Sequence, residues 1–209
     1  MSTGFNNTFA KQVIKWKSLL IASLITIILS GCTTLLVAGA VITTVDVLLD
    51  RRTVGEYIDD GAIELTAKNI VISNPEYRKA SHLKPISWNG ILLVSGEVTD
   101  ETIKQQIIEK YTNIQGVRQV VDETEITDRS KFLTRTNDSW ITSQVKSRLV
   151  LKTGLKANRV KVTTTRGSVF LMGIVTKEEA EKATSVAQVV RGVKRVVKVF
   201  EYQEPSSNN

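Results

Sequence analysis

Residues 166–173 read Arg-Gly-Ser-Val-Phe-Leu-Met-Gly, a tight turn followed by an apolar strand that ends at a second glycine. Residues 89–96 read Asn-Gly-Ile-Leu-Leu-Val-Ser-Gly and repeat this form 77 positions earlier in the 209-residue chain. A third glycine recurs after 76 positions, at Gly116 and Gly192, and each is followed by a valine-rich segment. Spacing this regular predicts two copies of one folding unit.

The opening helix of each copy is predicted from a single apolar face. In the second copy, apolar residues recur at helical spacing at Ile141, Val145 and Leu149. In the first copy the corresponding residues are Ile63, Ala67, Ile70 and Val71. An acidic residue before each stripe is expected to cap the helix by accepting a hydrogen bond from a free backbone N–H: Asp138 in the second copy, and Asp59 or Asp60 in the first.

The middle of each copy reads as a β-hairpin. Asn89 and Gly90 both tolerate the positive φ that a type I′ turn requires, and residues 166–167 take the same place in the second copy. A second helix follows, capped by Asp100 in the first copy and by a capping box at 176–179 in the second. The order helix, strand, strand, helix, strand predicts an α+β fold in which both helices cover one face of a small mixed sheet.

Each copy resembles the BON domain family. The resemblance is carried by residues 167–175, Gly-Ser-Val-Phe-Leu-Met-Gly-Ile-Val, and by residues 192–197, Gly-Val-Lys-Arg-Val-Val. The first copy departs from the family pattern by Ile-Leu-Leu at 91–93 and by a polar insert at 74–84. The sequence therefore predicts two tandem BON domains.

The N-terminal segment predicts export and lipid attachment. Three lysines precede the apolar residues 19–29, and Leu-Ser-Gly-Cys at 29–32 has the form of a lipoprotein signal peptide. Eleven apolar residues are too few for a transmembrane helix, because crossing about 30 Å of hydrocarbon needs roughly 20. We expect cleavage before Cys32 and acylation of its thiol, palmitate included, rather than a membrane span or a buried cysteine. Bacterial lipoproteins retained in the inner membrane generally have Asp after the cysteine, and Thr33 here indicates, by resemblance, the outer membrane.

The composition argues against an enzyme or a metal site. The chain has one cysteine and one histidine, so a zinc site lacks ligands and a catalytic triad would depend on His82 alone. His82 lies in a polar stretch that reads as a solvated loop. The glycines occur singly at turns and form no phosphate-binding loop. We expect no catalytic residues, no cofactor, no metal and no small-molecule substrate, and export also argues against nucleic acid.

The two copies have opposite charge. Residues 53–128 contain seven Lys or Arg against thirteen Asp or Glu, whereas residues 135–200 contain fourteen against four. Two segments of opposite sign are not expected to present the same kind of surface.

Trp140 marks a candidate membrane-contacting face on the first helix of the second copy. At 100° per residue its side chain lies about 140° from the centre of the apolar stripe, so it points away from its own core. Three residues share its face, Gln144, Ser147 and Leu151, and three cations flank the helix, Lys146, Arg148 and Lys152. An indole beside cations suits the headgroup region of an anionic membrane. The alternative is that Trp140 packs against the neighbouring domain.

Lipid attachment combined with two BON copies resembles the dual-BON outer-membrane lipoproteins. The resemblance implies a non-enzymatic, periplasm-facing protein that binds anionic phospholipid through its second domain, gathers at the division site and supports outer-membrane integrity. The alternative is a protein-binding adaptor for an envelope assembly or remodelling machine. The expected segments are a signal peptide (1–31), a lipidated N-terminus and tether (32–52), the first BON domain (53–128), a linker (129–134), the second BON domain (135–203) and a tail (204–209).

Overall fold

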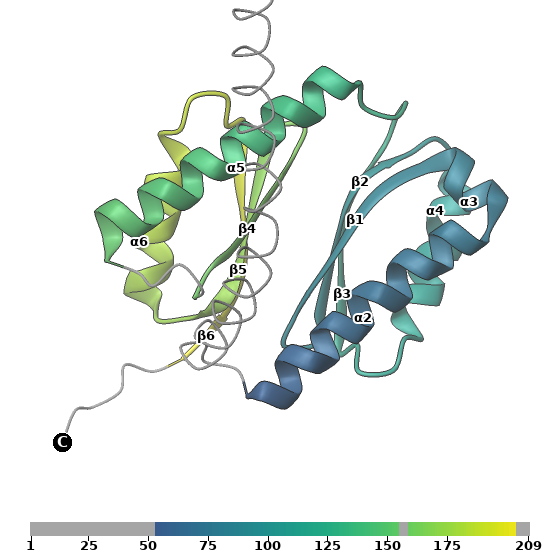
Figure 1. Cartoon of the computed structure of the whole chain (residues 1–209), viewed down its shortest axis with the longest axis horizontal. Coiled ribbons are helices and arrows are strands. Elements are labelled where there is room, and N and C mark those ends of the chain that lie inside the picture. The colour runs from purple at the N-terminus through teal and green to yellow at the C-terminus, as the bar shows by residue number, and fades with distance from the viewer. Residues whose placement is uncertain (1–52, 155–158, 204–209) are drawn as a thin grey trace, which may run out of the picture. The chain divides into compact units, whose positions relative to one another are not determined.

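The computed structural model describes residues 53–154 and 159–203, which form two domains of the same architecture (Figure 1). The predicted signal peptide, the tether with Cys32 and the tail at 204–209 lie outside the described residues. Each domain contains a three-stranded mixed sheet. The predicted α+β fold of two similar domains is confirmed.

The first domain has the sheet order β1-β2-β3. Strands β1 and β2 are antiparallel, and β3 runs parallel to β2 after the crossover through α4. The elements are α2 (Val54–Ser73), α3 (Pro75–Ala80), β1 (Ser81–Trp88), β2 (Ile91–Val98), α4 (Glu101–Thr112) and β3 (Gln119–Ile126). The predicted apolar face of α2 is confirmed, because Ile63 and Ala67 are buried against Leu92, Ile107 and Tyr111.

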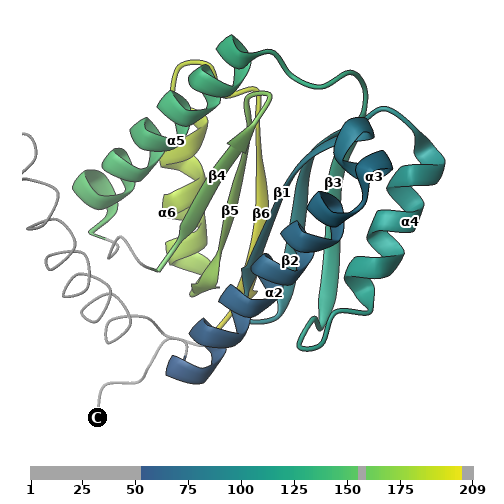
Figure 2. The ribbon, with the colours of Figure 1, turned by 45° about the vertical axis from the view of Figure 1, so that its right-hand side comes forward.

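The second domain repeats this topology as β4-β5-β6, with β4 antiparallel and β6 parallel to β5. Its elements are α5 (Phe132–Thr153), β4 (Lys161–Thr165), β5 (Ser168–Val175), α6 (Lys177–Gln188) and β6 (Arg195–Tyr202). The predicted capping box between Thr176 and Glu179 begins α6. In both domains the two long helices cover one face of the sheet (Figures 1 and 2).

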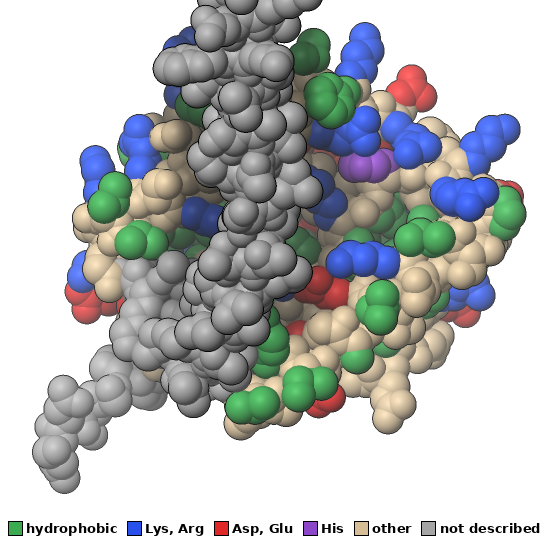
Figure 3. Space-filling model, viewed as in Figure 1, with side chains coloured by type: hydrophobic (Ala, Val, Ile, Leu, Met, Phe, Trp, Pro, Cys, Tyr) green, Lys and Arg blue, Asp and Glu red, His purple; other side chains and the backbone are tan. Residues whose placement is uncertain are grey.

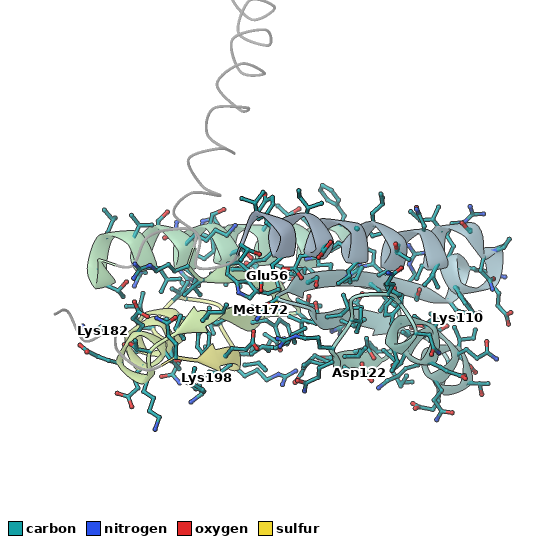
Figure 4. All side chains as sticks on the ribbon, turned by 90° about the horizontal axis from the view of Figure 1, so that it is seen from below. Glu56, Lys110, Asp122, Met172, Lys182 and Lys198 are labelled. Carbon is teal, nitrogen blue, oxygen red and sulfur yellow. The ribbon has the colours of Figure 1, made fainter. Side chains whose placement is uncertain are left out.

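The opposite faces of the two sheets share one apolar cluster. Trp88 and Leu93 of the first domain pack in it with Phe170 and Met172 of the second, and all four side chains are buried. Met172 lies between the two sheets in Figure 4. The two domains therefore bury apolar surface against each other in addition to their own cores.

The predicted capping roles of Asp60 and Asp138 are wrong. The helix α2 begins earlier, at a capping box formed by Thr53 and Glu56, and Asp59 does not cap it either. Asp60 is buried inside the helix, and its carboxylate accepts hydrogen bonds from the N–H groups of residues 89 and 90, at 2.7 and 3.0 Å.

Asp138 does the same in the second domain. It is buried in α5, and its two oxygens accept the N–H groups of Arg166 and Gly167 at 2.8 and 2.9 Å. These turn residues have φ of 50° and 81°, and Asn89 and Gly90 have 52° and 73°. The type I′ turn predicted at Asn89-Gly90 agrees with these angles, and an aspartate from the first helix of each domain holds the turn.

The segment predicted as a solvated loop around His82 is regular structure. Residues 75–80 form the short helix α3, capped by Asn74, and His82 lies in β1 opposite Glu97 of β2. The polar alternation of β1 arises because this strand sits at the edge of its sheet and carries polar side chains toward the second domain. The polar side chains of β1 therefore reflect contact with the second domain and not a solvated loop.

The repeated glycines are explained by close backbone approach. A Cβ on Gly96 would overlap the carbonyl oxygen of His82, and one on Gly173 would overlap the carbonyl oxygen of Arg159. Both glycines lie on the central strand of their sheet, where the antiparallel neighbour crosses closely. The 77-residue repeat of these glycines therefore reflects a packing requirement.

Candidate membrane-binding site

The helix α5 presents one face to its own core and the other outward. Ile141, Val145 and Leu149 are at most 4% exposed in the core of the second domain, as predicted. The helix ends at Gly154, whose φ of 66° is the left-handed conformation common after a helix C-terminus. Buried residues at this spacing fix the rotation of α5, and this determines which side chains point outward.

Trp140 points away from that core. Its side chain is 47% exposed and Leu151 is 82% exposed, while Ser147 is exposed and Gln144 is half-buried. The expected orientation of Trp140, away from its own core, is confirmed. Its packing against the neighbouring domain stays the alternative. Its contact with lipid stays a prediction.

Two exposed apolar residues at the start of α5 were missed from the sequence. The helix begins at Phe132, inside the segment expected to be a linker, and Lys131 at its N-cap position makes no side-chain capping bond. Phe132 and Leu133 are 73% and 79% exposed. Leu133 lies seven residues before Trp140 and eighteen before Leu151, so all three share one helical face. Extending the helical wheel by two turns would have found Leu133.

Three cations flank α5, at about 80° to 120° from Trp140 around the helix. Within the described parts of the chain, Lys146, Arg148 and Lys152 form no ion pair, and Arg148 is half-buried whereas both lysines are exposed. The one acidic residue of α5, Asp138, is buried and bound to the hairpin turn. The outer surface of α5 is therefore apolar and basic.

Part of the remaining positive charge of the second domain serves the contact with the first domain. Three cations of the second domain pair with acids of the first, and one pair has the opposite polarity. The pairs are Lys161–Glu64 at 2.6 Å, Arg195–Glu123 at 2.8 Å, Arg166–Glu125 at 3.2 Å and Arg118–Glu201 at 2.6 Å. The charge asymmetry seen in the sequence therefore describes the domain contact as well as an outward surface.

His82 belongs to this domain contact. Its Nδ1 lies 3.4 Å from Oε2 of the buried Glu97, and its Nε2 lies 3.3 Å from a guanidinium nitrogen of Arg135 at the start of α5. Burial lowers the pKa of His82 below its ordinary value of 6.5, and Arg135 and Arg129 act in the same direction, while the charge of Glu97 opposes them. Arg166 also approaches Glu97, at 3.8 Å.

Two further properties concern only the residues that the structure describes. Among them, no group of three or more His, Cys, Asp and Glu side chains is arranged to hold a metal ion. Within the same residues, every helix is too short or too polar to cross a membrane.

Two segments of the chain, residues 59–128 and 137–204, match the BON domain model. These segments make up more than half of the chain, which therefore belongs to the BON domain family.

The chain is similar to three curated proteins along most of its length. It is 34% identical over 177 residues to the outer membrane lipoprotein DolP of Haemophilus influenzae. This match covers 85% of the chain and 91% of DolP. It is 29% identical to the 21 kDa hemolysin of Actinobacillus pleuropneumoniae, and this match covers 74% of the chain and 79% of the hemolysin. It is 27% identical to the osmotically-inducible protein Y of Escherichia coli, and this match covers 68% of the chain and 72% of that protein. These relationships support a DolP-like dual-BON protein of the cell envelope, lipid-anchored at the outer membrane and facing the periplasm.

Proposed function

We propose that this protein binds anionic phospholipid through the outer face of α5 while an acylated Cys32 anchors it to the outer membrane. The observation that carries the proposal is the half-exposed Trp140, which shares one face of α5 with the exposed Leu133 and Leu151. The helix is flanked by cations that form no ion pair with the residues that the structure describes. The similarity to an outer membrane lipoprotein supports a membrane as the surface that this face meets.

The chemistry of α5 suits the boundary between headgroups and acyl chains. The indole of Trp140 has an apolar body and a polar N–H, so it favours the interfacial layer. Leu133 and Leu151 would leave water on the same side of the helix, and Lys146 and Lys152 would approach phosphates, each contributing about 1 kcal/mol near an anionic surface. Neutral membranes lack this second contribution, which predicts selectivity for anionic lipid.

Two modest attachments would together give stable residence. A single acyl chain gives marginal and reversible binding, and a second signal such as a basic or apolar surface makes the attachment durable. Cys32 would confine the protein to one membrane, and α5 would orient the domains on it. Mass spectrometry of the purified N-terminus tests the proposed attachment through Cys32. A chain that begins at an acylated Cys32 is expected, and a retained leader or a free thiol would contradict this part of the proposal.

Vesicle co-sedimentation tests the proposed binding of anionic phospholipid by α5. Residues 53–209 contain the hydrophobic cores of both domains and every strand that the structure describes. Circular dichroism is used first to confirm that this piece folds. We expect binding to anionic vesicles and much weaker binding to neutral ones. Trp140→Ala should lower the bound fraction, whereas Val189→Ala, which removes another exposed apolar side chain outside α5, should leave it unchanged. Equal binding to both vesicle types, or no effect of Trp140→Ala, would refute the proposal.

We also propose, from the resemblance to the dual-BON lipoproteins, that the protein is not an enzyme, gathers at the division site and supports outer-membrane integrity. A fluorescent fusion in dividing cells, compared with its Trp140→Ala variant, tests the location. Loss of midcell signal together with increased sensitivity to detergent is the expected result. A partner protein retained in pull-downs by the Trp140→Ala variant would favour the adaptor alternative instead.

A further inference from the structure

The helix α2 of the first domain carries an exposed apolar stripe that neither the fold nor the proposed lipid site uses. At 100° per residue its four large side chains lie within about 40° of one another, on the opposite side of the helix from the buried Ile63. Each of the four is more than half exposed: Val54 at 56%, Ile58 at 64%, Leu65 at 61% and Ile72 at 58%. An apolar row of this length on a surface helix favours a docking function.

The side chains beside the α2 stripe suit a boundary between water and lipid. Tyr57 and Lys68 lie about 40° to 75° from its centre around the helix. The side chain of Lys68 is 51% exposed and Tyr57 is 41% exposed. A tyrosine ring with its hydroxyl and a lysine with its long aliphatic stem each place an apolar body in lipid and a polar end in the headgroup layer.

The acidic residues of α2 are turned away from the stripe. Glu56, Asp59 and Asp60 lie at least about 120° from its centre. Glu64 lies closer, but its carboxylate is bound by the ammonium group of Lys161 at 2.6 Å. A lipid surface on this side of α2 therefore meets apolar side chains and one lysine, and no carboxylate of the helix has to enter lipid.

The helices α2 and α5 lie on the same side of the two domains. In Figure 4, α2 with Glu56 and α5 run along one edge of the molecule, whereas α6 with Lys182 and α4 with Lys110 run along the opposite edge. Hydrophobic side chains are visible along the courses of both α2 and α5 on the face shown in Figure 3. The apolar cluster between the sheets and the ion pairs around it hold the domains in this arrangement. One membrane can therefore meet both helices.

The chain joins α2 to the proposed anchor. The twenty residues 33–52 lie between Cys32 and Thr53, which is the N-cap of α2. Fully extended, at about 3.5 Å per residue, they span at most about 70 Å. An acylated Cys32 therefore keeps the α2 stripe close to one bilayer and raises the effective concentration of lipid at the stripe. Contacts too weak to hold a free protein on a membrane suffice under this constraint.

We propose that the α2 stripe is a second membrane-contacting face, whose apolar side chains enter the boundary between headgroups and acyl chains of the membrane that carries the anchor. The inference rests on the proposed acylation of Cys32 and extends membrane contact to the first domain. The stripe has one lysine beside it, whereas three cations flank α5. Contact through α2 therefore depends little on the charge of the lipid, and selectivity for anionic lipid stays with α5.

Quenching of a reporter tryptophan by brominated phospholipid tests this contact. The acylated full chain is reconstituted into vesicles, with each of its three tryptophans replaced by phenylalanine and with Leu65→Trp as the reporter. Bromine on the acyl chains quenches only an indole that enters the bilayer. We expect emission at shorter wavelength and strong quenching in both neutral and anionic vesicles. The matched control Val189→Trp, at an exposed apolar residue outside α2 and α5, should keep its emission.

Added charge shows whether the stripe itself makes the contact. Ile58→Glu in the reporter chain should reduce the quenching several-fold, because it carries a carboxylate into the layer that the stripe enters. Thr66→Glu adds the same charge at an exposed position of α2 that lies more than about 100° from the centre of the stripe, and it should leave the quenching unchanged. Circular dichroism confirms that each variant is folded. Equal effects of the two substitutions would overturn the proposal.

An unquenched reporter at position 65 would also overturn it. Emission that shifts to shorter wavelength as the protein density rises, but resists bromine, would do so by assigning the stripe to a protein partner or a second copy. A chain that keeps Trp140 as its single tryptophan is measured in parallel, so that the lipid site of α5 is judged separately. Quenching of Trp140 without quenching at position 65 refutes the α2 contact alone, and the reverse refutes the α5 site alone. Mass spectrometry of the same sample reports the state of Cys32, and a free thiol there would refute the anchor on which the inference rests.

Discussion

Asp60 and Asp138 hold equivalent places in the two domains, each on the first helix with its carboxylate accepting both backbone N–H groups of its own hairpin turn. They are 78 residues apart in the sequence, and each is at most 3% exposed. A buried carboxylate that binds two turn amides couples the position of the helix to that of the hairpin. The repeated aspartate is thus a part of the fold, placed where a sequence pattern resembles a helix cap.

Removing this carboxylate is expected to destabilise its domain. Asp60→Ala leaves the N–H groups of Asn89 and Gly90 without their charged acceptor, which should lower the free energy of unfolding by about 2 to 4 kcal/mol. The matched control is Asp59→Ala, at the adjacent exposed position, which should change it by less than about 0.5 kcal/mol. Urea denaturation of both variants measures the difference, and equal effects would contradict the assigned role.

The apolar cluster between the two sheets predicts that the domains unfold together. Phe170 is 1% exposed in this cluster, so Phe170→Ala should cost about 3 to 5 kcal/mol and separate the unfolding of the two domains. The control is Phe132→Ala, whose side chain is 73% exposed. Unfolding is followed by tryptophan fluorescence and by circular dichroism. Coincident transitions in Phe170→Ala, at unchanged stability, would show that the cluster does not couple the domains.

The histidine at the domain contact predicts a loss of stability in mild acid. Because burial lowers the pKa of His82 below 6.5, the unfolded chain binds a proton more readily than the folded chain. This contribution to stability is fully present above pH 6.5 and is lost as the pH falls through the lower folded pKa. Between about pH 7 and pH 5, the free energy of unfolding should therefore fall more steeply in the unmodified protein than in His82→Gln. Parallel pH profiles would exclude His82 as the source.

Gly61 marks a position in α2 where adding a side chain is expected to stabilise the protein. It lies inside α2 with open space around it among the described residues, so Gly61→Ala should raise the free energy of unfolding by about 0.5 to 1 kcal/mol. The contrasting variant is Gly173→Ala, which should destabilise because a Cβ there meets the carbonyl oxygen of Arg159. Thermal unfolding in dilute solution measures both. A loss of stability in Gly61→Ala would mean that the glycine serves the fold itself.

The sequence predicted those features that depend on local periodicity. The stripe of Ile141, Val145 and Leu149 fixes the rotation of α5, and so the outward direction of Trp140 followed from spacing alone. The turn at Asn89-Gly90 followed from the backbone freedom of these two residue types. The succession of helices and strands along the chain also followed, because the duplicated pattern can be read twice.

Features that depend on tertiary contacts could not be read in the same way. Spacing does not distinguish an aspartate that caps its own helix from one that binds a turn 28 residues later, as Asp138 does. The polarity of β1 reflects contact with the second domain, so His82 resembled a loop residue. Leu133 was missed because α5 starts without a side-chain cap at Lys131, which removes the usual sequence signal for a helix start.

The fluorescence of Trp140 tests the central claim most directly. In residues 53–209 the tryptophans are Trp88, which is 5% exposed, and Trp140, so a Trp88→Phe variant reports on Trp140 alone. Titration with anionic vesicles should shift its emission to shorter wavelength, because the indole leaves water for the headgroup boundary, while neutral vesicles should produce little change. The Trp140→Phe variant, which keeps only Trp88, serves as the control and should not respond. An unchanged Trp140 emission at saturating anionic lipid would contradict membrane binding by α5.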